Sequence, residues 1–152
     1  MLTGFLHLHN FLRWFALLAI LFSLIRSFNG MRKGAAFTKP DNLWSLLTLI
    51  AFHTQLLVGL VLYFGNGWYR LLGEMSDKLV RFYSMEHTLG MLIAIALVTI
   101  GRVSSKKAST DKAKHKKIFW FFFIALIITL ASIPWPFREV IGRPWFPGMS
   151  AS

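Results

Sequence analysis

The sequence has no cysteine, which excludes disulfides, thiolate metal sites and the covalent attachment of haem through cysteine. Acidic residues are also scarce, with 6 Asp and Glu against 17 Lys and Arg in 152 residues. Most of the basic residues lie in two segments, 26–42 and 102–117, which separate apolar blocks. This pattern indicates membrane topology rather than a nucleic-acid partner. No basic segment precedes the first apolar block, so we expect no cleavable signal peptide.

Hydrophobic residues make up 55% of the chain and fall into four long blocks, a composition too apolar for a soluble domain of this size. Asp41 or Asn42 is expected to cap the second helix and Asp77 the third, whereas Pro134 should end the fourth. The sequence therefore predicts an all-α, single-domain membrane protein over 1–152, an up-down bundle of four transmembrane helices at about 2–25, 43–64, 79–101 and 118–137.

The distribution of positive charge predicts the orientation of this bundle. The loops 26–42 and 102–117 carry most of the basic residues, so the positive-inside rule places both loops in the cytoplasm and both termini outside, N-out/C-out. The tail 138–152 then either caps the outer mouth of the bundle or binds a partner. His115, in the second basic loop, is expected to be solvated.

Three histidines are predicted to lie at similar depths in the membrane. Only 12 uncharged residues follow Arg13 before the next charge, too few to cross the bilayer, so the first helix must also contain His9 and Arg13. At a rise of about 1.5 Å per residue, His9 and His87 lie about 12 Å below the outer face and His53 about 16 Å below it. Ionisable residues inside a span usually face the bundle interior. We therefore predict a cofactor or metal site formed by His9, His53 and His87, with Arg13 one turn below His9 and Glu86 beside His87.

Haem b is the cofactor that this arrangement favours. Neutral imidazoles from facing helices of a four-helix bundle commonly hold haem iron. The first and third helices of an up-down bundle can lie diagonally, so His9 and His87 could clamp a porphyrin, and His53 with His87 is the other pairing. Arg13 and Arg138 are expected to neutralise haem propionates.

Other roles stay open at this stage. Glu86 could accept the N–H of a ligating histidine, or carry a proton to a bound quinol. Gly59 and Gly90 either leave room for a large planar ligand or mark helix contacts. A bare zinc, copper or iron ion held by the three histidines and Glu86 would make a membrane oxidase or hydrolase. In a third alternative, the polar layer only locks the helices of a non-catalytic accessory subunit.

The stretch RFYSMEHTLGMLIAIALVTIGR, with LHNFLRW in the first helix and AFHTQLLVGLVLYF in the second, resembles a family of small bacterial four-span membrane proteins commonly labelled cytochrome b-like. The segments FTKPDN and SIPWPF extend the resemblance over most of the chain. It implies haem b, electron transfer with quinone or a membrane redox complex, and a place in the bacterial inner (cytoplasmic) membrane. It also implies that the family shares His9, His53, His87, Arg13 and Glu86.

Overall fold

The computed structural model describes residues 1–146, which form helices joined by short connections and contain no strand. Two short 3₁₀ helices, Trp68–Leu71 and Glu139–Ile141, lie in the connections. Four helical segments are long and apolar enough to cross a membrane, which confirms the predicted all-α four-helix membrane bundle. These are α1 (Leu2–Lys33), α2 (Lys39–Gly65), a third segment made of α3 (Lys78–Arg81), a π-helical turn (Phe82–Glu86) and α4 (His87–Lys106), and α5 (Asp111–Ser132).

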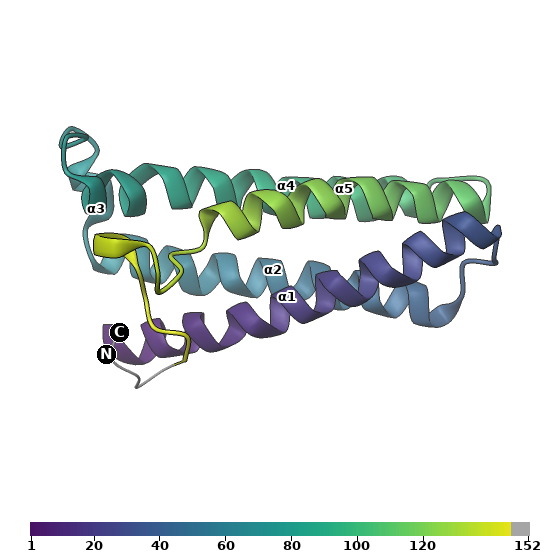
Figure 1. Ribbon diagram of the computed structural model, residues 1–152, viewed down its shortest axis with the longest axis horizontal. Helices are drawn as coiled ribbons and strands as arrows, with labels where there is room; N and C mark the ends of the chain where they lie inside the picture. The colour runs from purple at the N-terminus through teal and green to yellow at the C-terminus, as the bar shows by residue number, and fades with distance from the viewer. Residues whose placement is uncertain (147–152) are drawn as a thin grey trace.

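The four long segments run alternately up and down (Figure 1). α1 packs against α2 and α5, and α4 packs against the same two helices. α1 and α4 therefore lie diagonally across the bundle, as expected for the first and third spans. The two basic connections are at one end, and the N-terminus lies at the other end together with residues 133–146 (Figure 1).

The bundle interior combines buried Phe and Ile side chains with small ones, and the outside is covered by large apolar side chains. Ala19, Ala94 and Ala125 are at most 1% exposed, so the helix backbones approach closely, as is common between membrane helices. The buried hydroxyls of Ser23 and Thr48 are hydrogen-bonded at 2.9 Å and link α1 to α2. The exposed faces carry Phe, Leu, Ile and Val side chains along every long helix, and this surface suits lipid chains.

The helices extend past the predicted spans at the basic end, with α1 running to Lys33, α4 to Lys106 and α5 starting at Asp111. The predicted cap of α2 and the predicted end of α5 also need correction. α2 begins at Lys39, because Thr38 and not Asp41 is the N-cap. The two residues form a capping box in which the Thr38 N–H donates to Asp41 Oδ2 at 2.8 Å. α5 ends at Ser132, five residues before the predicted end at 137, because Pro134 follows. The predicted cap at Asp77 is confirmed, since its Oδ1 accepts from the Val80 N–H at 2.9 Å.

The expectation that His115 is solvated is wrong. α5 begins at Asp111, so His115 is a helical residue in its first turns, and its side chain is only 1% exposed. The ring packs over Gly30 of α1, where the missing side chain makes room for it, and lies 5.0 Å from the Phe37 ring centre. His115 is therefore a packing residue at the basic end of the bundle.

Candidate functional site

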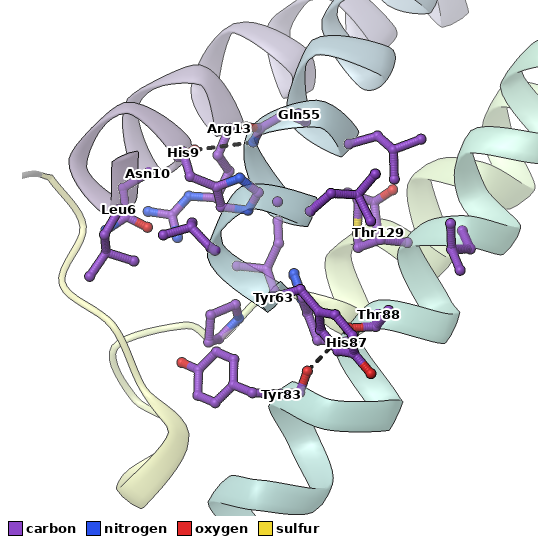
Figure 2. A pocket seen from close by; sticks show the side chains of 18 of the residues that line it. Leu6, His9, Asn10, Arg13, Gln55, Tyr63, Tyr83, His87, Thr88 and Thr129 are labelled. Carbon is purple, nitrogen blue, oxygen red and sulfur yellow. Dashed lines mark hydrogen bonds between the residues drawn. The ribbon is translucent and has the colours of Figure 1, made fainter. Parts of the chain in front are cut away.

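A cavity of about 210 Å³ lies between the helices in the half of the bundle near the N-terminus (Figure 2). Its walls are mainly apolar and come from α1, α2, α4, α5 and the segment after α5. Three of the five predicted site residues line it: His9, Arg13 and His87. The other two, His53 and Glu86, do not.

His9 and His87 face the same cavity from diagonal helices. Their ring centres are 6.3 Å apart and their ring planes are inclined by 73°. His87 Nδ1 lies 2.8 Å from the backbone carbonyl of Ser132, and because a carbonyl only accepts, Nδ1 carries the proton. The lone pair of His87 is therefore on Nε2. His9 Nδ1 is buried and has no hydrogen-bond partner.

A π-helical turn directly precedes His87. The His87 N–H donates to the carbonyl of Phe82, five residues back, instead of to the carbonyl four residues back. Such turns hold one extra residue and recur at functional sites. The Thr88 hydroxyl donates to the carbonyl of Tyr83, also five residues back, at 3.1 Å (Figure 2). This turn sets which side chains of the third segment face the cavity.

The prediction that Glu86 joins His87 in the bundle interior is wrong. Glu86 is exposed, and its Oε1 accepts from Arg81 Nε at 2.8 Å on the outer surface. Consecutive helical residues point about 100° apart, so the neighbours of a cavity residue on its two sides face different directions. Thr88, which follows His87, lines the cavity, whereas Glu86, which precedes it, lies on the exposed side of the helix.

The prediction that His53 completes the histidine layer is wrong for the same geometric reason. His53 is exposed on the outer face of α2, and its Nδ1 lies 2.8 Å from the Leu49 carbonyl in its own helix. The side of α2 that lines the cavity carries Phe52, Gln55 and Gly59 instead. The Gln55 side-chain amide donates to the His9 carbonyl at 3.1 Å and links α2 to α1 (Figure 2).

Arg13 brings a buried positive charge to the cavity. The residue is 6% exposed, and its Nη2 donates to the Trp145 carbonyl at 2.9 Å. The guanidinium carbon lies 5.2 Å and 5.8 Å from the ring centres of Trp14 and Trp135. Its Nε is buried without a partner, and no carboxylate of residues 1–146 pairs with it. An anionic group in the cavity would satisfy this charge.

Two further residues of the cavity were missed from the sequence. Arg143 lines the cavity, and its Nε donates to the Tyr83 hydroxyl at 2.9 Å. Tyr83 in turn donates to the Ile141 carbonyl at 2.8 Å. Tyr83 precedes His87 by one helical turn, so helical periodicity could have found it, whereas nothing in the sequence places Arg143. Arg138, expected at a propionate, instead donates to backbone carbonyls and does not line the cavity.

The segment after α5 folds back across the N-terminal end of the bundle (Figure 1). The Trp14 indole N–H donates to the Trp145 carbonyl at 3.0 Å, and the Trp14 ring stacks on Trp145 and Phe146. Of the two roles left open for the tail, its described part thus caps the bundle end. Residues 147–152 lie outside the described residues.

The predicted site of three histidines and one carboxylate is not formed. Within residues 1–146, no group of three or more His, Cys, Asp or Glu side chains is placed to hold a metal ion. His9 and His87 remain as two nitrogen donors that face one cavity. Comparisons with protein-family models, curated proteins and solved structures find no match to this chain.

Proposed function

We propose that this protein is a membrane haem b cytochrome, or a cytochrome-like subunit, that exchanges electrons with quinone or a redox partner. His9 and His87 would hold the haem. One observation carries the proposal: the two rings, from helices that lie diagonally, face one cavity with their centres 6.3 Å apart.

The spacing of the rings fits two ligands of one metal. A metal–imidazole bond is about 2.0–2.1 Å, and a ring nitrogen lies about 1.1 Å from its ring centre. Two imidazoles on opposite sides of one metal therefore have ring centres about 6.3 Å apart, and the observed separation is 6.3 Å.

The surrounding residues support the same assignment. The Ser132 carbonyl accepts the His87 Nδ1 proton, which fixes the tautomer and orients the ring with Nε2 free. Arg13 and Arg143 line the cavity and offer positive charge to the carboxylates of a porphyrin. The cavity walls are mainly apolar, which suits the face of a porphyrin, and a bound haem would supply one-electron chemistry.

The charge distribution supports an orientation with this site in the outer half of the membrane. Eleven of the 17 Lys and Arg residues lie in the segments 26–42 and 102–117, which contain the two connections and the adjoining helix ends at the other end of the bundle. In this orientation, electrons are exchanged near the extracytoplasmic face. The resemblance of the sequence to cytochrome b-like proteins agrees with this proposal.

The test is the absorption spectrum of protein purified from cells supplied with haem, before and after reduction with dithionite. We expect a Soret band that shifts and sharp α and β bands on reduction. His9→Ala and His87→Ala should each lose the bound haem, whereas His53→Ala, the matched control on the lipid-facing surface, should retain it. A featureless visible spectrum, or equal haem content in all three variants, would sink the proposal and leave an accessory subunit with a structural polar layer.

A further inference from the structure

A second cavity lies at the opposite, basic end of the bundle. Its volume is about 310 Å³, and it is bounded by the connection between α1 and α2, by the start of α2, and by α4 and α5. Four cationic side chains line it: Lys39, Arg102, Lys106 and Lys114. None of its lining residues belongs to the histidine cavity, so the two are separate sites.

Arg102 is a buried cation in the wall of this cavity. The residue is 5% exposed, although it carries a full positive charge. Its Nη1 donates to the Asn42 carbonyl at 3.1 Å and to the Ser45 hydroxyl, and its Nη2 donates to Asn42 Oδ1 at 3.2 Å. All of these acceptors are neutral. A buried charge is stable when an opposite charge compensates it, and the protein supplies none to Arg102 within residues 1–146.

The carboxylates at this end are already engaged. Asp41 accepts from Arg26 Nε at 2.8 Å, and Asp111 accepts from Lys114 Nζ at 2.9 Å. The other four acidic residues of the chain follow α2, lie near the start of the third segment, or follow α5, all at the histidine end. Three cations of the cavity thus have no carboxylate partner in the part of the chain that the structure describes.

We propose that this cavity binds the phosphate group of an anionic phospholipid. Arg102 stands one residue beyond the predicted third span, 79–101, at the level where the hydrocarbon ends and headgroup phosphates begin. Phosphate oxygens accept from guanidinium and ammonium groups, and basic pockets between membrane helices on the cytoplasmic side recognise anionic headgroups. The buried Arg102 provides a fixed charge, and the exposed Lys39 and Lys106 close around the phosphate from the water side.

Matched lysine pairs give the test. Lys39 and Lys106 are exposed and line the cavity, whereas Lys33 and Lys107 are exposed at the same end and do not. The double variants Lys39→Gln/Lys106→Gln and Lys33→Gln/Lys107→Gln remove equal charge and leave Arg102 in place. Full-length protein in neutral detergent is titrated with short-chain phosphatidylglycerol, with phosphatidylcholine of the same chains, and with inorganic phosphate, and binding is followed by native mass spectrometry.

Phosphatidylglycerol should bind more tightly than phosphatidylcholine, and inorganic phosphate should compete with it. The cavity pair should weaken phosphatidylglycerol binding about tenfold or more, and the control pair by about threefold or less. Inorganic phosphate that binds as tightly as phosphatidylglycerol would keep the phosphate site but assign it to a soluble ligand. Equal losses in the two pairs, or equal binding of the two lipids, would overturn the proposal. Circular dichroism verifies that both pairs keep their helix content, and Lys106→Gln against Lys107→Gln repeats the comparison with single changes.

Discussion

Gly59 offers a graded test of the histidine cavity. A Cβ at this position would lie 3.4 Å from His9 Cε1 and 3.9 Å from His9 Nδ1, an ordinary van der Waals contact. Gly59→Ala should therefore fit, and helix propensity favours it by up to about 1 kcal/mol. Gly59→Val adds two methyl groups on a Cβ with restricted rotamers, so at least one presses on the His9 ring. Overpacking of this kind costs about 1–3 kcal/mol, which raises the dissociation constant of a ligand that needs this ring by about 5-fold to 150-fold.

The assay is a titration of limiting haem into the purified variants, with haem content read from the reduced spectrum. Gly59→Ala should reach half-saturation at the same haem concentration as the unmodified protein. Gly59→Val should need a much higher haem concentration to reach half-saturation. Gly4→Val is the matched control, because nothing lies within 4 Å of a Cβ at Gly4. If Gly59→Val loads haem as readily as Gly59→Ala, the position of the His9 ring does not govern binding and the reasoning fails.

Three further predictions concern stability and the tail. Gly101→Ala places a Cβ 2.5 Å from the Cβ of Phe121 in α5. It should therefore lower the free energy of unfolding in SDS by about 1–3 kcal/mol relative to Gly4→Ala. Asp41→Asn removes half of a capping box and an ion pair, and should cost about 0.5–2 kcal/mol in the same assay. Tyr83→Phe removes the hydroxyl that binds the tail at two points, so trypsin should cleave the tail about five times faster.

Each of these predictions has a control that isolates its cause. Asp111→Asn loses a more exposed pair and should cost about 0–1 kcal/mol, less than Asp41→Asn. Tyr69→Phe, away from the tail, should leave the cleavage rate unchanged. Equal stability of Gly101→Ala and Gly4→Ala would mean that α4 and α5 are not packed as closely at Gly101 as the structure has them.

The fold could be predicted from the sequence because lipid leaves few options. Backbone groups in the hydrocarbon must bond within their own segment, so long apolar blocks are helices, and charged loops mark their ends. Asp41 does stabilise the start of α2, but it does so as the third helical residue and not as the N-cap. Thr38 precedes the apolar block, so the hydrophobic pattern does not mark it as the start of the helix.

The site could be predicted only in part, because depth along a helix is easier to read than direction around it. His9 and His87 were found from depth alone, and the diagonal arrangement brought them together. His53 lies at a similar depth but on the outer side of α2. The positions of Gln55 and Gly59 on the cavity side could have shown this, since a helix presents only one face inward. The π-helical turn before His87 has no signature in the sequence.

The glycines resolve the alternative left open for them. Gly59 lines the cavity beside His9, so it does leave room next to the site. Gly90 instead faces Ser132 and Ile128 of α5 and marks a helix contact. The same residue type thus serves two purposes, and only the neighbour across the interface distinguishes them.

His9 and His87 also lie in different halves of the molecule. α1 with α2, and α4 with α5, are two hairpins, each closed by a basic connection, and only residues 66–77 join them. His9 belongs to the first hairpin and His87 to the second. A group bound by both histidines would thus connect the two hairpins across the bundle. Hairpins produced as separate chains, cut within 66–77, should find each other more readily when that group is present.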